Sequence, residues 1–186
     1  MQLSLSFKGI TQRTSASSLS VAGIQTKTVR ILITTILIGC GLILSGCDTW
    51  DEANQAYIKG EYQKAFNLTL PLAEDGEARA QSRLGYMFTQ GHGVSRDYQS
   101  AFKWYRKAAE QGDTNGQSGL GHMYSEGLGI PQDYKQAFKW YRQAAEQGDV
   151  NGQSGLGYLY IEGLGVPQDY QLAAKWYHQA AKQGDV

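Results

Sequence analysis

A unit of 36 residues is written three times in succession, and this repetition constrains the fold more than any other feature. The pair Leu84-Gly85 recurs as Leu120-Gly121 and as Leu156-Gly157. Each copy of such a repeat is one supersecondary unit that buries its apolar face only against its neighbours. The sequence therefore predicts a solenoid in which the same surface positions return once per copy, a form typical of proteins that bind other molecules.

Apolar residues within each copy have helical spacing. In the middle copy, one face of a 3.6-residue helix carries Tyr134, Ala137, Phe138, Tyr141, Ala144 and Ala145. Asp133 is a typical N-cap residue, and a glycine follows Gln147, so we predict a helix between them. A shorter helix is predicted from Gln117 to Ser125. The predicted fold class is all-α, namely an α/α solenoid of antiparallel helix hairpins.

Glycines inside the shorter helix need an explanation, because each costs about 1 kcal/mol relative to alanine. We expect Gly119 and Gly121 to let neighbouring helices approach closely. The repeats themselves are predicted at residues 77–113, 114–149 and 150–186, and residues 51–76 are predicted to be a degenerate capping hairpin. At the other end, the faces of Tyr177 and Ala180 would be uncovered, so we expect a truncated member, or a partner or second copy stacked end to end.

The repeat pattern L-G-x-[MLV]-[YF]-x-x-G-x-G-[VI]-x-x-[DN]-Y, followed by A-x-K-W-Y and A-A-x-Q-G, closely resembles the Sel-one-like repeat (SLR). Copies 114–149 and 150–185 agree at 26 of 36 positions. The resemblance implies a superhelix like that of tetratricopeptide repeats and a scaffold that assembles proteins. Envelope members of the family are associated with polysaccharide secretion, cell-wall enzymes or host contact, so a bacterial envelope protein is expected.

The N-terminal segment differs in charge from the rest of the chain. All 17 acidic residues lie at or after Asp48, whereas residues 1–47 carry only the basic residues Lys8, Arg13, Lys27 and Arg30. A basic start followed by the apolar run at 31–44 is typical of an export signal. The run is shorter than the roughly 20 residues that span a bilayer. We therefore interpret residues 1–46 as a signal peptide that is cleaved.

A shorter signal is an alternative at the start of the chain. Thirty residues before the apolar core form an unusually long basic region, whereas initiation at Val29 would give a signal of ordinary length. In that case residues 1–28 would not belong to the expressed protein.

Residues after the apolar run resemble the lipobox of bacterial lipoproteins. They read Leu44-Ser45-Gly46-Cys47. The resemblance implies cleavage before Cys47, lipidation of its thiol, and a lipidated N-terminus at residues 47–50. Two or three acyl chains, at about 0.8 kcal/mol per buried CH₂, make a stable anchor. A second box ends at Cys40 but would leave an apolar stretch on the mature chain, and an incidental cysteine is a further alternative.

The residue after the lipidated cysteine bears on localisation. Enteric-type bacteria read an aspartate there as retention in the inner membrane, so Asp48 is a predicted sorting residue. The predicted location is the cell envelope, anchored by lipid and facing the periplasm, with the outer membrane as the alternative. Trp50 would then lie either at the membrane interface or against the first hairpin.

No pattern in the sequence indicates catalytic, metal or cofactor residues. His92, His122 and His178 occupy non-equivalent repeat positions and form no H-x-x-x-H pair. The G-x-S-x-G motif does not occur, and the paired cysteines of SLR proteins linked to β-lactam binding are missing. We therefore expect a protein that is not an enzyme, with β-lactam hydrolysis the least favoured function.

One row of side chains per repeat is the predicted partner-binding surface. Its members are Lys103, Trp104, Arg106, Lys139, Trp140, Arg142, Lys175 and Trp176. The indoles would either fill the core between repeats or expose their edges on a concave wall beside the cations. The predicted function is a lipid-anchored scaffold that binds an envelope protein as adaptor or regulator. The alternative partner is an envelope glycan or exopolysaccharide, and no nucleic-acid partner is expected.

Overall fold

The computed structural model describes residues 49–184, which contain helices and turns and no strand. These residues belong to the second of two compact units, Ser45–Val186, and only this unit is described. The predicted signal peptide, Cys47 and Asp48 lie outside the described residues. A helix covers residues 49–58 and is followed by α2 (Tyr62–Glu74), α3 (Ala78–Gln90), α4 (Tyr98–Glu110), α5 (Thr114–Glu126), α6 (Tyr134–Glu146), α7 (Val150–Glu162) and α8 (Tyr170–Gly184).

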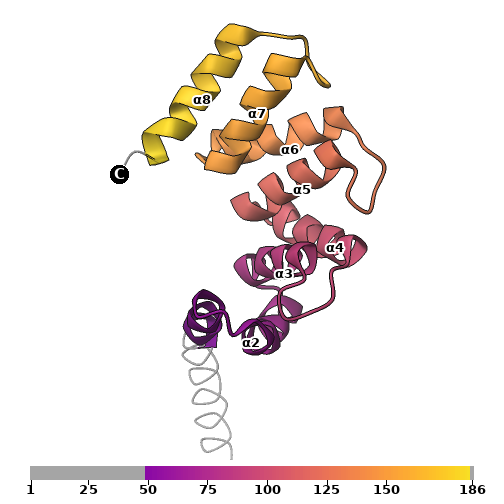
Figure 1. The fold of residues 1–186 in the computed structure, drawn as a ribbon, viewed down its shortest axis with the longest axis vertical. Helices are drawn as coiled ribbons and strands as arrows, with labels where there is room; N and C mark the ends of the chain where they lie inside the picture. The colour runs from indigo at the N-terminus through magenta and orange to yellow at the C-terminus, as the bar shows by residue number, and fades with distance from the viewer. Residues whose placement is uncertain (1–48, 185–186) are drawn as a thin grey trace, which may run out of the picture. The chain divides into compact units, whose positions relative to one another are not determined.

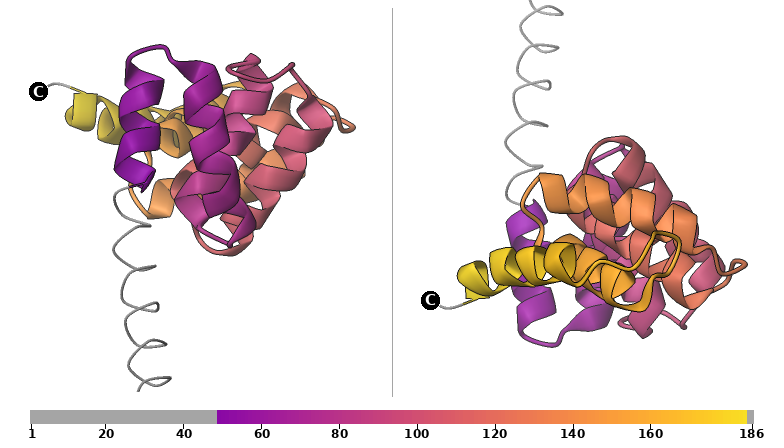
Figure 2. Two further views of the ribbon diagram at one scale, coloured as in Figure 1. Left: turned by 90° about the horizontal axis from the view of Figure 1, so that it is seen from below. Right: turned by 90° about the horizontal axis from the view of Figure 1, so that it is seen from above.

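Consecutive helices pair into hairpins that stack in chain order (Figure 1). Helices α3 and α4 form one hairpin, α5 and α6 the next, and α7 and α8 the last. Each hairpin contacts the one that follows, and the two views along the stack in Figure 2 show their changing orientation. The predicted fold, an all-α solenoid of antiparallel helix hairpins, is confirmed. No helix between residues 49 and 184 is long and apolar enough to cross a membrane.

Helix ends follow local capping chemistry. The carboxylate of Asp133 accepts hydrogen bonds from the backbone amides of Lys135 at 3.0 Å and of Gln136 at 3.1 Å, so α6 begins where predicted. By contrast, α5 begins earlier than the predicted Gln117. The Asp113 carboxylate accepts a hydrogen bond from the amide of Gly116 at 2.7 Å and starts the helix there. The glycine therefore continues the helix instead of delaying it.

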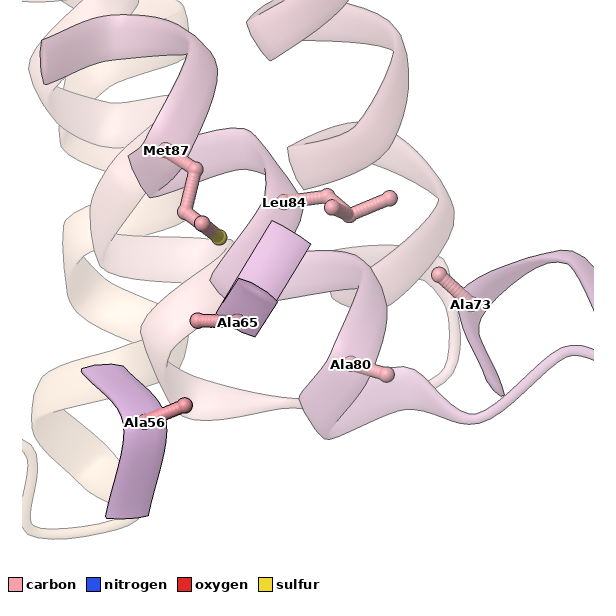
Figure 3. Close-up of a cluster of buried hydrophobic side chains, with 6 residues drawn as sticks. All are labelled: Ala56, Ala65, Ala73, Ala80, Leu84 and Met87. Carbon is pink, nitrogen blue, oxygen red and sulfur yellow. The ribbon is translucent and has the colours of Figure 1, made fainter. Parts of the chain in front are cut away.

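Alanines dominate the core, which lets the helices pack closely. The cluster under the first two hairpins consists of Ala56, Ala65, Ala73, Ala80, Leu84 and Met87 (Figure 3). Trp50 is partly buried and packs against this cluster, as one of the two alternatives for it predicted. Equivalent clusters around Leu120 and Leu156 serve the next two hairpins. The 36-residue sequence period thus reappears as a period in the core.

Glycines and a tyrosine form each joint between repeats. The ring of Tyr105 lies between Gly85 of its own hairpin and Gly119 of the next, and a Cβ on Gly119 would lie 2.5 Å from ring atom Cε1. Tyr141 lies in the same way between Gly121 and Gly155. Both rings are only 7% exposed. The packing role predicted for the helix glycines is confirmed, because no side chain larger than hydrogen fits against the ring.

Exposure at the end of the stack follows the prediction for one of its two residues. Tyr177 occupies the position of Tyr105 and Tyr141, but among the glycines of residues 49–184 its ring lies against Gly157 alone, and it is 38% exposed. Ala180 is only 6% exposed, so the expectation that its face is uncovered was wrong. Its side chain is short enough to be covered within its own hairpin.

Candidate functional site

The first helix of each hairpin lies on the inner side of the stack. Helix α3 contacts α5, and α5 contacts α7, whereas the second helices α4 and α6 make no comparable contact with each other. Successive hairpins are therefore closer at their first helices. A groove with a volume of about 600 Å³ follows this inner side, from the helix at 49–58 across α3 and α5 to α7.

Residues at equivalent repeat positions line the groove. One position is serine in every copy, and a second is arginine in the first copy and asparagine in the other two; these residues are Ser82, Ser118, Ser154, Arg79, Asn115 and Asn151. The rings of Tyr105 and Tyr141 contribute apolar surface to the groove. No aspartate or glutamate of residues 49–184 lines it. The groove is therefore polar and uncharged along α5 and α7, and cationic at α3.

Two arginines from α3 stack on aromatic rings of the helix at residues 49–58. The guanidinium of Arg83 lies 4.6 Å from the ring centroid of Tyr57 and 5.6 Å from that of Trp50, and it donates a hydrogen bond to Asn54 Oδ1 at 3.0 Å. The guanidinium of Arg79 lies 4.7 Å from the Trp50 ring. Cation–π contacts of this kind hold a guanidinium in place without neutralising its charge.

Tyr57 connects this cluster to the loop after α3. Its hydroxyl oxygen lies 2.8 Å from His92 Nδ1, and the imidazole stacks on Tyr62 with ring centroids 4.1 Å apart. Burial is the largest cause that raises the pKa of Tyr57 to about 12, and neighbouring Tyr86 and Tyr62 add to it while Arg83 opposes it. The hydroxyl is therefore neutral at physiological pH and is available for hydrogen bonding.

The other two histidines have separate surroundings. His122 is exposed and lines the groove, whereas His178 is exposed on α8. Within residues 49–184, no group of three or more histidine, cysteine, aspartate or glutamate side chains could hold a metal ion.

The predicted partner-binding row lies on the second helices and not in the groove. Its tryptophans, Trp104, Trp140 and Trp176, are partly buried, and each packs against a core cluster that combines the first helix of its own hairpin with helices before it. This supports the interpretation that the indoles fill the core between repeats. None of the eight predicted residues lines the groove, so their role in partner binding stays a prediction.

The basic side chains of that row are exposed, and the charges of two of them are partly compensated by glutamates. Arg106 Nε pairs with Glu110 Oε1 at 2.7 Å, and Arg142 pairs with Glu146 at the same distance. On α4, Lys103, Trp104 and Arg106 line a smaller hollow of about 370 Å³. The structure brings residues of one repeat together there, but it does not join the rows of different repeats into one cavity.

Sequence reasoning missed the serine and asparagine positions of the groove. A signal for them exists, because Asn-Gly-Gln-Ser-Gly is identical at 115–119 and 151–155. The glycines of this segment indicated close packing. The curvature that turns its polar residues inward depends on contacts between hairpins.

The model of the Sel1 repeat matches residues 78–113, 114–149 and 150–185. The chain belongs to the Sel1 repeat family. Sel1 repeats typically mediate protein–protein interactions, and the family consists of scaffolds that are generally not enzymes. No curated protein matches this Sel1 repeat chain.

Solved structures similar to this Sel1 repeat chain include a Sel1 repeat protein from Oxalobacter formigenes, with 36% identity and a TM-score of 0.68 over 74% of this chain. A protective antigen of uropathogenic Escherichia coli with an SLR fold has 38% identity and a TM-score of 0.68 over 75% of this chain. The chain spans 55% of the first protein and 31% of the second. Cysteine rich protein B of Helicobacter pylori is 27% identical, with a TM-score of 0.52 over 66% of this chain and 91% of its own.

Proposed function

We propose that this Sel1 repeat protein is a lipid-anchored scaffold of the bacterial cell envelope that binds a segment of a partner protein in its inner groove. It acts as an adaptor or regulator. The observation that carries the proposal is the groove itself, which continues across the inner helices of successive hairpins. Ligand sites in repeat proteins are expected on such inner surfaces, because every copy contributes the same positions to them.

Groove chemistry favours a peptide. The side-chain amides of Asn115 and Asn151 are exposed, recur in successive repeats, and can donate to and accept from a peptide backbone. Tyr105 and Tyr141 also line the groove, and the exposed 7% of each adds a small apolar surface for side chains of a bound segment. An extended chain offers backbone amides and alternating side chains at regular spacing, which is the form that a repeated surface can bind.

The glycan alternative depends on the second helices. There Glu110 and Glu146 pair with the arginines of the row, which lowers the net positive charge that an anionic polysaccharide would meet. The inner groove is therefore the preferred surface, and a protein is the preferred partner.

A photo-crosslinking amino acid distinguishes the two surfaces. Placed at Asn151 in the groove of the full chain in its native host, it is expected to capture a discrete protein, whereas the same group at Lys139 on α6 is the matched control. Capture at Lys139 alone would move the binding surface to the predicted row. Recovery of polysaccharide in place of protein would favour the glycan alternative.

Lipid anchoring has its own test. Metabolic labelling with an alkyne fatty acid is expected to label the wild-type chain in the membrane fraction, and Cys47→Ala is expected to lose both label and sedimentation with membranes. A soluble, unlabelled wild-type chain would contradict the anchor. Fractionation of Asp48→Ser against the wild type tests the proposed inner-membrane location, because the change is expected to move the protein to the outer membrane.

A further inference from the structure

We infer that the groove binds a partner segment that carries aspartate or glutamate side chains, and that Arg79 and Arg83 are the residues that receive them. This inference rests on the proposed function of the groove. It names the chemistry of the partner at one place along the groove, where the first repeat differs from the other two.

The positive charge of the groove comes from helix α3. Arg79 and Arg83 are the cations of the groove lining, and no acidic residue of the described chain lines the groove. Glu77 pairs with Arg79 at the start of α3, so that arginine is partly compensated. Arg83 hydrogen-bonds the neutral amide of Asn54 and has no ion pair within residues 49–184. The groove therefore carries a net positive charge centred on Arg83.

The two guanidinium groups are oriented in a way that suits binding of a carboxylate. The two arginines lie one helical turn apart on α3, so their guanidinium groups emerge on the same face. Cation–π contacts hold them there, with Arg79 Cζ 4.7 Å from the Trp50 ring centroid and Arg83 Cζ 4.6 Å from the Tyr57 ring centroid. Each guanidinium has five N–H donors; Arg79 uses Nε toward Glu77 and Arg83 uses Nη2 toward Asn54, so other donors remain for a ligand. A preorganised guanidinium binds a carboxylate through two parallel hydrogen bonds, which a lysine cannot form.

The two arginines lie part-way along the groove. The inner helices follow in the order 49–58, α3, α5 and α7, so the arginines are flanked by Trp50 on one side and by Asn115 on the other. The cations thus lie along the groove, with lining residues on both sides of them. A segment that passes through the groove meets them with its side chains, so side-chain carboxylates fit better than the carboxylate of a chain terminus.

Selection from random dodecapeptides displayed on phage tests the inference. The bait is the full chain purified in detergent. Selected peptides are expected to be enriched in aspartate and glutamate, and Arg83→Gln is expected to weaken their binding about tenfold, as expected for the loss of a charge-assisted hydrogen bond. Arg96→Gln is the matched control, because Arg96 is exposed, stacks on Tyr98 and does not line the groove.

Two further variants separate charge from folding. Arg83→Lys retains the positive charge and is expected to retain part of the preference for acidic peptides. Arg83→Glu reverses the charge and is expected to select basic peptides, a result that a purely structural role of Arg83 would not produce. Circular dichroism of each variant checks that the helices remain formed.

The outcomes distinguish this inference from the proposed function. Peptides that bind in the groove and are blocked by Asn115→Trp, at an exposed lining position, but show no acidic enrichment, would overturn the inference and leave the groove proposal intact. Acidic peptides whose binding is unchanged in Arg83→Gln would also overturn it. Failure to select any peptide would overturn both, and binding of alginate that depends on Arg83 in the absence of peptide binding would replace the acidic segment with an anionic polysaccharide.

Discussion

The joints between repeats differ from the joint after the first hairpin in which helix carries the large side chain. In both cases a position on the second helix of one hairpin is compared with a position on the first helix of the next. Between repeats, a large ring on the second helix, such as Tyr105, meets a glycine on the next first helix, Gly119. At the first joint, the equivalent positions hold the small Thr69 and the large Arg83. Thr69 is 1% exposed and donates a hydrogen bond to the carbonyl oxygen of Ala65 at 2.7 Å.

This exchange has a functional consequence. Where tyrosine supplies the volume, the residue is only 7% exposed and adds no charge to the groove. At the first joint, Arg83 takes the position of the glycine; its guanidinium stacks on Tyr57 and its side chain lines the groove. One pair of substitutions thus converts a structural joint into a charged part of the groove, without altering the pairing of the helices.

Removal of a tyrosine from a joint between repeats should have the largest effect on stability. Tyr141→Thr is expected to lower the free energy of unfolding by about 3 kcal/mol, because it leaves a cavity between two glycines that cannot fill it. Tyr177→Thr is the control and should cost about 1 kcal/mol or less, since that ring is 38% exposed and meets one glycine. Urea denaturation followed by circular dichroism measures both. Equal losses would show that the second glycine contact is unimportant.

Addition of one methyl group to a joint is the next test. Gly155→Ala is expected to cost about 2 kcal/mol, because its Cβ would lie 2.6 Å from Cε1 of the Tyr141 ring. Gly184→Ala, with no atom within 4 Å of its Cβ, is the control and should not destabilise the protein. In a Tyr141→Thr background the clash disappears, so Gly155→Ala should become neutral or stabilise by up to about 1 kcal/mol. Additive effects of the two changes would contradict direct contact.

Conversion of the first joint toward a repeat joint should have a smaller effect. Arg83→Gly removes the stacking on Tyr57 and Trp50 and places a glycine in α3, which together should cost about 1–2 kcal/mol. Adding Thr69→Tyr to this variant rebuilds the arrangement of the repeats and is expected to recover part of the loss. Thermal unfolding of the single and double variants measures the coupling. A double variant that is less stable than Arg83→Gly would show that the two kinds of joint are not interchangeable.

The buried tyrosines of the repeat joints should make the stability of the protein depend on pH in the alkaline range, with no effect at neutral pH. Burial raises the pKa of Tyr105 and of Tyr141 above the ordinary value of 10.0. Because the unfolded chain releases these protons first, stability is fully present below about pH 10 and is lost as the pH rises toward the folded-state pKa. Tyr105→Phe and Tyr141→Phe are expected to flatten this loss, measured as urea midpoints between pH 9 and 11. A steep loss that persists in both variants would place its cause elsewhere.

Much of the fold could be predicted from local patterns. The face of α6, with Ala137 and Tyr141 buried, follows from 3.6-residue spacing, and its start follows from the capping chemistry of Asp133. The start of α5 could not be predicted, because Gly116 disfavours a helix by local propensity. Close packing reverses this preference, since a Cβ at Gly116 would lie 2.7 Å from Ala108 Cβ.

The candidate site was harder to predict than the fold. Exposed cations and tryptophans on α4 and α6 indicated a binding row, yet Trp104 packs into the core and Arg106 pairs with Glu110. The groove residues Ser118 and Asn115 have ordinary chemistry, and their importance comes only from the surface on which they lie.

By itself, the sequence determined the repeat, the helix hairpins, their caps and the need for glycine at the joints between repeats, because these depend on neighbours within a few turns of the chain. Only the tertiary structure decided which helices face inward and that Arg83 enters the groove. The direction of curvature is a sum of contacts between hairpins 36 residues apart, and no local pattern records it.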